Sequence, residues 1–154
     1  MALDRVPPQV VAELPGDDAV GEIRFPLQFD RRFQLWSFHV SHGVLLLRSN
    51  SRPGLPGRVD VMFRGVTALR VRNEYANLLL DRVPLEEAAK VVGGDIDAVE
   101  RDTHVFSLGA AGGPPGFVVA GSAHFSEDDL EYGEPSSIDH PQLSAHILRS
   151  GDFG

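Results

Sequence analysis

The sequence predicts a mainly β domain of the α+β class, in which an antiparallel meander forms a sandwich-like or barrel-like core with one short helix. Two observations carry this prediction. Between residues 33 and 125, short runs of β-branched, leucine and aromatic residues alternate with turn-forming residues, which is typical of antiparallel strands. A helical pattern stands out at residues 84–92. The length of 154 residues suits a single domain, 1–154, with one hydrophobic core.

The first predicted strands are residues 33–40, 44–49 and 58–65. Gly43 allows a tight turn between the first two, and the Pro- and Gly-containing stretch 50–57 precedes the third. If both hairpins close symmetrically, the side chains alternate between two apolar faces. One face would carry Trp36, Phe38, Val40, Leu45, Leu47 and Met62, and the other Phe33, Leu35, Val44, Leu46, Val59, Val61 and Phe63. Because both faces are apolar, we expect a layer packed on each of them.

Strands at residues 67–72 and 75–83 are predicted to extend this sheet to five strands. The helix at 84–92 follows, because Pro84 suits a first helical position and Gly93 suits a C-terminal cap. Its apolar stripe is expected to cover one face of the sheet and consists of Leu85, Ala88, Ala89 and Val92.

Strands at residues 103–108 and 117–125 are predicted to form a hairpin across the loop 109–116. That loop is rich in glycine but lacks the lysine and hydroxyl residues of a phosphate-binding loop. The remaining expectations are an irregular segment 1–26 with one short strand, a helical turn at 95–102, and an acidic, mostly irregular tail from about residue 126 with a last strand at 144–149.

The composition narrows the cellular context. Cysteine is absent, which excludes disulfides and thiolate metal sites and favours a reducing compartment. The first eight residues contain an acid and two prolines where a signal peptide would begin, so we expect a cytoplasmic protein. No apolar run approaches the roughly 20 residues that cross a bilayer, and we expect no membrane span. Arginine outnumbers lysine thirteen to one, which is typical of a high-GC bacterium.

Charge is unevenly distributed along the chain. The net charge of −8 makes nucleic acid an unfavourable partner. Six arginines nevertheless lie between residues 48 and 72, against one acid, Asp60, so weak RNA binding remains an alternative to a solubilising role at strand edges. Residues 127–139 carry six acids and neither lysine nor arginine. This acidic stretch would suit a basic protein partner, and the ordinary interpretation is a solvated surface.

Histidines supply the candidate metal ligands. His39 and His42 are three residues apart, which in a strand places them on opposite faces. We therefore interpret His42 as a turn residue and His39 as a hydrogen-bonded histidine of the core or the rim. His104 and His124 lie on the two strands of the predicted hairpin, and Asp102 adds a carboxylate. These three residues could bind a divalent metal with an open water position. The long loop leaves the register open, and a shift of one residue separates the two imidazoles.

Residues 33–49 and 58–66, with the sequences FQLWSFHVSHGVLLLRS and RVDVMFRGV, resemble short uncharacterised bacterial β-rich proteins. The resemblance implies the strands already predicted and assigns no activity. Some small acidic β-rich bacterial proteins act as immunity proteins against toxins.

The leading hypothesis is therefore a non-enzymatic binding or interaction protein, immunity-like or self-associating, that uses no cofactor. The sequence contains no recognisable nucleophile motif, which favours a binding protein over a hydrolase. One alternative is a metal-dependent enzyme or small-molecule-binding β-fold that uses His104 and His124, and another is a weak RNA-binding module.

Overall fold

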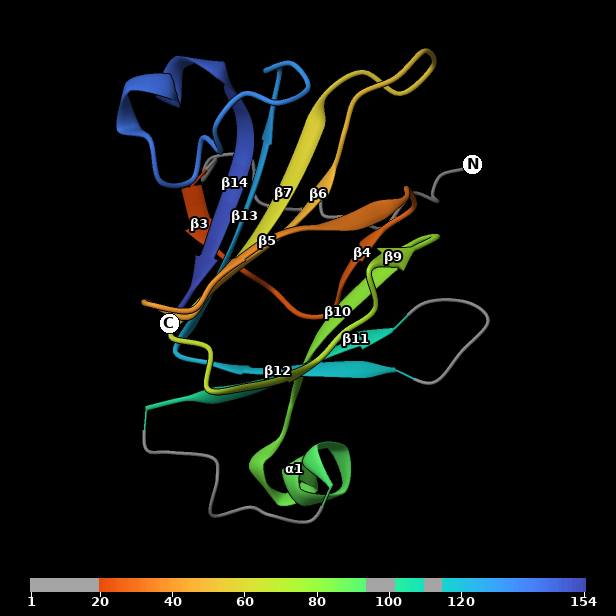
Figure 1. The fold of residues 1–154 in the computed structure, drawn as a ribbon, viewed down its shortest axis with the longest axis vertical. Coiled ribbons are helices and arrows are strands. Elements are labelled where there is room, and N and C mark those ends of the chain that lie inside the picture. Colours follow the sequence, from red (N-terminus) through yellow and green to blue (C-terminus); the bar gives the residue numbers. More distant parts are fainter. Residues whose placement is uncertain (1–19, 94–101, 110–114) are drawn as a thin grey trace.

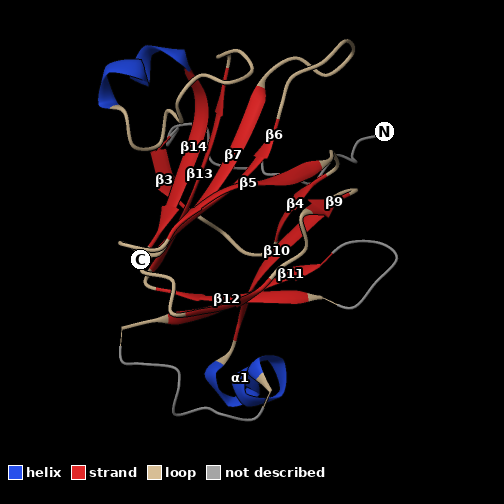
Figure 2. Ribbon diagram, viewed as in Figure 1, coloured by secondary structure: helices blue, strands red, loops and turns tan. Residues whose placement is uncertain are grey.

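The structure, a computed structural model, describes residues 20–93, 102–109 and 115–154 (Figure 1). It consists of two β-sheets and one short α-helix, which confirms the predicted mainly β class (Figure 2). No helix within the described ranges is long and apolar enough to span a membrane. The predicted helical turn and most of the glycine-rich loop fall in 94–101 and 110–114, outside the described residues.

The larger sheet has seven strands, and all neighbours in it are antiparallel except the pair β14 and β3. In spatial order the strands are β3 (Val20–Glu22), β14 (Ile147–Phe153), β13 (Ser122–Asp128), β7 (Arg58–Arg64), β6 (Val44–Ser49), β5 (Phe33–His39) and β9 (Glu74–Tyr75). The predicted β5–β6–β7 meander is confirmed. Gly43 has φ +59°, and a Cβ there would lie 2.8 Å from the backbone N and O of Val66, so the turn between β5 and β6 requires glycine.

The smaller sheet has five strands, in the order β4 (Leu27–Phe29), β10 (Leu78–Val83), β11 (His104–Gly109), β12 (Gly116–Ala120) and β8 (Ala68–Arg70). The prediction that β8 and β10 extend the first sheet is therefore wrong. The predicted strand 117–125 is also two strands, because the chain passes from the small sheet to the large sheet at Gly121. In Figure 1, β12 runs steeply across the direction of β13.

The two sheets pack face to face around the main core, as in a β-sandwich. Phe63 of β7 lies 5.4 Å from Phe106 of β11, and Phe29 of β4 lies 5.8 Å from Phe125 of β13, measured between ring centroids. Each of these fully buried side chains contributes roughly 1.5 to 3 kcal/mol through the area it removes from water. The inner face of each sheet is thus covered by the other sheet.

The register of the large sheet differs from the prediction. Leu45 lies opposite Phe63 and Leu47 opposite Val61, so both leucines point into the core. Leu46 lies opposite Met62 and points to the outer face. The predicted division into two faces is wrong, because a β-bulge between Leu35 and Ser37 breaks the symmetry of the first hairpin and because the second hairpin closes in another register.

Helix α1 (Leu85–Val92) confirms the predicted helix and covers the outer face of the small sheet (Figure 2). Pro84 is its N-cap, and Gly93, with φ +95°, is its C-cap. Ala88 packs with Val105 and Val119 in a second, smaller core. Leu85, which the sequence places in the buried stripe, is 67% exposed.

The acidic tail is more ordered than predicted. After β13, residues 129–140 form no regular element, then a 3-10 helix, η2, spans Pro141–His146 and β14 completes the sheet. The predicted last strand at 144–149 therefore begins three residues later and continues to Phe153. The irregular residues 129–140 lie against the outer face of the large sheet, where several of the buried side chains are charged.

Candidate functional site: a groove over a buried charge network

Four charged side chains are buried on the outer face of the large sheet. Arg48, Asp60, Arg58 and Asp128 lie on neighbouring strands β6, β7 and β13, and each side chain is at most 2% exposed. Arg48 is directly opposite Asp60, and Arg58 is directly opposite Asp128, so strand alternation places all four on one face. We call these four residues the buried charge network.

Cations and anions alternate in this network. Arg48 Nε and Nη2 donate to Asp60 Oδ1 and Oδ2 over 2.7 and 3.0 Å. Arg58 Nε and Nη2 donate to Asp128 Oδ1 and Oδ2 over 3.2 Å each. Arg58 Nη2 also lies 3.9 Å from Asp60 Oδ2, which links the two pairs. Two bidentate arginine–carboxylate pairs thus form a continuous network with no net charge.

Arg58 also holds the segment that follows β13. Its Nη1 donates to the backbone oxygens of Glu134 and Glu131 over 2.7 and 3.3 Å, and its Nη2 donates to that of Pro135 over 2.8 Å. Together with the two bonds to Asp128, these contacts satisfy all five N–H donors of the guanidinium. Arg58 therefore fixes residues 131–135 over the sheet.

Asp128 holds the same segment at both ends. Its Oδ1 accepts the backbone N–H of Leu130 over 3.1 Å, and its Oδ2 accepts the hydroxyl of Ser137 over 2.7 Å. The Ser137 hydroxyl lies 2.7 Å from that of Ser126 on β13. The segment between Leu130 and Ser137 is therefore attached to the sheet at its two ends by Asp128 and along its middle by Arg58.

Burial of this network carries a desolvation cost that its hydrogen bonds offset. Removing two arginines and two aspartates from water costs several kcal/mol per ion, which their mutual attraction only offsets when the remaining polar groups are bonded. Here the donors and acceptors of Arg58 and Asp128 are bonded to backbone and hydroxyl groups. A fully bonded buried network selects one arrangement of the segment over others.

A groove of about 340 Å³ lies between this segment and β5. Its apolar floor consists of Val44, Leu46 and Met62. One wall consists of Trp36, Ser37 and His39 of β5, and the other of residues 133–136 with Asp139 and His140. The groove combines an apolar floor with one aromatic and one acidic wall.

An aromatic pair stands at the edge of the groove. The rings of Trp36 and Tyr132 meet edge to face, with centroids 5.4 Å apart and planes at 89°. The guanidinium of Arg48 lies 4.9 Å from the Trp36 ring centroid, so the buried charge network supports the indole through a cation–π contact. Tyr132 is 74% exposed. The exposed Tyr132 thus packs on Trp36, which in turn packs on the buried Arg48.

The charges around the groove are acidic. Asp129, Glu131, Glu134 and Asp139 belong to the segment that forms one side, and residues 129–140 contain neither lysine nor arginine. The side chains of Asp129 and Asp139 are 59% and 42% exposed, and their Oδ1 atoms lie 2.7 and 2.8 Å from the Nδ1 atoms of His146 and His140. Arg48 and Arg58 do not offset this charge, because they face Asp60 and Asp128 within the buried network. The surface beside the groove is therefore net negative.

The structure separates the two histidines of the metal hypothesis. His104 lies on β11 of the small sheet, opposite Ala120, whereas His124 lies on β13 of the large sheet, opposite Met62. The predicted pairing of His104 with His124 is wrong, because the chain changes sheets at Gly121 between their partner strands. His124 instead contacts Asp152 Oδ1 through Nδ1 at 2.7 Å and the Ser122 hydroxyl through Nε2 at 2.9 Å.

Among the described residues, no group of three or more histidines, aspartates and glutamates is arranged to hold a metal ion. Asp102 is exposed at the start of the β11 region. His39 lies on the groove wall, and His42 contacts the neighbouring Ser41 hydroxyl in the β5–β6 turn at 3.2 Å. The two histidines thus occupy the rim and turn positions expected from the sequence.

His104 has a lowered pKa. Its Nδ1 lies 3.2 Å from Arg82 Nη2, and its ring packs on Phe153 with centroids 4.9 Å apart. Partial burial lowers the pKa below the ordinary 6.5, Arg82 lowers it further, and Asp102 acts in the opposite direction. Because the folded protein binds this proton less tightly than the unfolded chain, His104 leaves stability unchanged well above pH 6.5 and reduces it as the pH falls through and below that value.

We expect the His104→Gln variant to lose part of the decrease in melting temperature that the wild type shows between about pH 7 and about pH 5. The reason is that the variant has no imidazole whose protonation favours unfolding. The control is His42→Gln, which removes an exposed turn histidine. An NMR titration that gave His104 a pKa above 6.5 would contradict this assignment.

The six arginines between residues 48 and 72 do not form one basic surface. Arg48 and Arg58 are buried in the charge network. Arg70 and Arg72 lie over the rings of Phe117 and Tyr75, at 5.5 and 4.9 Å. The arginines are thus divided between the two sheets, unlike the continuous basic stripe that RNA-binding surfaces present.

The sequence contained signals for this site that its periodicity did not resolve. Arg58, Asp60 and Arg48 interrupt otherwise apolar strands at alternating positions, which indicates paired charges on one face. Asp128 and Tyr132 lie within the acidic stretch, where nothing local distinguishes a buried aspartate from a solvated one. No family model matches the chain, and no match was found among curated proteins or solved structures.

Proposed function

We propose that this protein is a non-enzymatic, cytoplasmic binding protein that docks a basic protein partner in the groove, in an immunity-like role. The observation that carries the proposal is the pair of the half-buried Trp36 and the exposed Tyr132, which lies beside an acidic segment and over the buried charge network. An aromatic pair that is surrounded by polar residues is typical of a protein–protein interface.

Aromatic side chains dominate protein recognition. Tryptophan and tyrosine are enriched among the few interface residues that carry most of the binding free energy, especially where neighbouring contacts exclude water. Trp36 and Tyr132 are held in place before binding, since Arg48 supports the indole and Arg58 fixes the segment that carries Tyr132. Such preorganisation reduces the entropy that would otherwise be lost on association.

The charge around the groove favours a basic partner. Exposed carboxylates at Asp129 and Asp139 attract lysine and arginine side chains and orient the encounter. At the exposed Tyr132 ring, cation–π attraction to such a side chain contributes roughly 0.5 to 1 kcal/mol. The whole-chain charge of −8 acts in the same direction.

The experiment is affinity capture from the native cell with the wild type, followed by titration of the captured protein against Tyr132→Ser. We expect a basic protein to be captured, and Tyr132→Ser to weaken its binding by roughly tenfold or more, as expected for a central aromatic anchor. Because Tyr132 is exposed, the substitution leaves the core intact. The affinity should also fall as salt is raised.

The matched control is Leu85→Ser, which removes an exposed apolar side chain on α1. This helix packs on the outer face of the small sheet, away from the groove. It should bind the partner as the wild type does. Equal loss in both variants, or an unchanged affinity in Tyr132→Ser, would contradict docking in the groove. Capture of a second copy of this acidic chain alone would favour self-association instead.

A further inference from the structure

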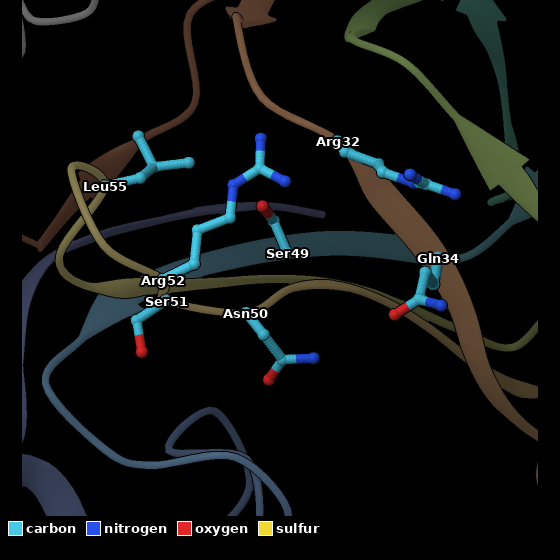
Figure 3. Close-up of a pocket in the computed structure, with 7 residues that line it drawn as sticks. All are labelled: Arg32, Gln34, Ser49, Asn50, Ser51, Arg52 and Leu55. Carbon is cyan, nitrogen blue, oxygen red and sulfur yellow. The ribbon is translucent and has the colours of Figure 1, made fainter.

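A second pocket, which shares no lining residue with the groove, lies between the start of β5 and the loop that follows β6. It encloses about 260 Å³. Figure 3 shows its two sides, with Arg32 just before β5 and Gln34 of β5 on one side, and Ser49 at the end of β6 with Arg52 and its loop neighbours on the other. Its lining is almost entirely polar, and Leu55 is its one apolar member.

The pocket is electropositive. Two of its lining residues are arginines, Arg32 and Arg52, and none is an aspartate or glutamate. Arg32 is paired with a single carboxylate outside the lining, Glu74, at 2.6 Å. Among the described residues, Arg52 has no ion-pair partner. A guanidinium without a carboxylate at the edge of a pocket offers a two-pronged donor to an incoming anion.

The loop that carries Arg52 is rigidly held. Arg52 and Leu55 exchange two backbone hydrogen bonds, of 3.1 and 2.8 Å, across Pro53 and Gly54. Residues 52–55 form a turn with proline at its second position and glycine at its third, the sequence that a type II turn favours. Gly54 has φ +82°, the positive value that the third position of such a turn requires. The backbone that presents Arg52 is therefore fixed before any ligand arrives.

A third arginine closes the base of the same loop. Arg31 Nε donates to the Ser49 hydroxyl over 2.7 Å, and its Nη2 donates to the Gly57 backbone oxygen over 2.7 Å and to those of Ser49 and Asn50 over 3.3 Å. Burial lowers the pKa of the Arg31 guanidinium, and Arg52 and Arg149 lower it further against the opposing effect of Glu127. Arg31 therefore lies close enough to Arg52 for the two positive charges to repel each other.

One lining group also lacks a partner. Asn50 Oδ1 is buried, and among the described residues it accepts no hydrogen bond. A buried acceptor that is left unbonded costs roughly 1 to 3 kcal/mol. Because Asn50 Oδ1 is closed to solvent, it is not a ready contact for a ligand, and the pocket offers chiefly the Arg52 guanidinium beside that of Arg32.

We infer that this pocket binds the dianionic group of a small phosphate monoester. A phosphate monoester carries about −1.5 to −2 charges at neutral pH and three oxygens that arginine can bind bidentately. The volume suits one small phosphorylated molecule, since it lies just below the usual range for drug-sized ligands. This site is independent of partner docking in the groove.

The test uses the full chain at constant ionic strength, with inorganic phosphate and glycerol 3-phosphate as probes and chloride as the reference anion. Binding is followed by calorimetry and by the rise in melting temperature that a ligand of the folded state produces. We expect saturable binding of both probes. Arg52→Gln should weaken both by about tenfold or more, as loss of a charged hydrogen-bonding group does.

The matched control is Arg24→Gln, which removes an exposed arginine outside the pocket lining and should leave both affinities within about twofold. Asn50→Asp places a carboxylate in the lining and should abolish binding of both probes. The inference is overturned if neither probe binds saturably, if Arg52→Gln binds as the wild type does, or if a phosphoserine peptide binds while both small probes fail to bind.

Discussion

Replacing Val61 with aspartate is expected to abolish the cooperative melting transition. Val61 is fully buried between the two sheets, where it lies opposite Leu47 and Phe125 on the neighbouring strands. The inner face around it consists of apolar side chains, so the new carboxylate would have no cation and no water. An unpaired buried charge costs several kcal/mol, a large part of the roughly 5 to 15 kcal/mol by which a domain of this size is stable.

The measurement is thermal unfolding followed by circular dichroism, with Val40→Asp as the matched control. Val40 lies in the β5–β6 turn and is 81% exposed, so the same substitution there should change the melting temperature by no more than a few degrees. A Val61→Asp variant that melted like the wild type would show that Val61 does not face the core.

Arg58→Met is expected to lower the free energy of unfolding by about 3 to 5 kcal/mol. The substitution keeps most of the apolar volume but leaves Asp128 buried without its cation and Asp60 with one cation in place of two. It also removes the donors that hold the backbone oxygens of Glu134 and Pro135. Chemical denaturation measures the first effect, and amide hydrogen exchange in residues 129–140 measures the second.

Arg64→Met is the matched control, because Arg64 points outward from the same strand and, within the described part of the chain, forms no ion pair. It should change stability by no more than about 0.5 kcal/mol. The double variant Arg58→Met/Asp128→Leu should recover part of the lost stability, since it removes both buried charges, while residues 129–140 stay poorly protected. A well-protected segment in the double variant would contradict the role assigned to the network.

The local elements were predictable because their signals are local. Apolar runs bounded by turn residues identified β5, β6 and β7, and Pro84 and Gly93 marked the ends of α1. Helix caps and strand boundaries depend on the conformational preferences of a few neighbouring residues. These preferences are visible in a single sequence.

Sheet membership and register were not predictable, because they depend on contacts between distant segments. Positions 45, 46 and 47 of β6 are all leucine, so these three residues alone do not distinguish the core side of the strand from its outer side. The bulge near Trp36 shifts the pairing of β5 by one residue. Leu46, expected on the same face as Val61, lies instead on the opposite face, where it forms part of the groove floor at 6% exposure.

The prediction that His104 and His124 form a pair was wrong for the same reason, since it depended on which sheet each strand joins. An unbroken strand from residue 117 to 125 would have placed His124 beside β11, whereas a change of sheet at Gly121 moves it to another layer. The groove was hidden because its acidic wall is an irregular segment that is held by the buried arginine Arg58, not by any local pattern.

Site-specific cross-linking tests the proposed docking surface most directly. A photo-reactive phenylalanine analogue at position 132 reports which protein contacts the groove in the native cell, and the same analogue at position 85 reports contacts of the helix beneath the small sheet. We predict that one basic protein is cross-linked from position 132, that the yield falls as salt is raised, and that position 85 gives no comparable product. Equal products from both positions, or an acidic protein cross-linked from position 132, would contradict the account.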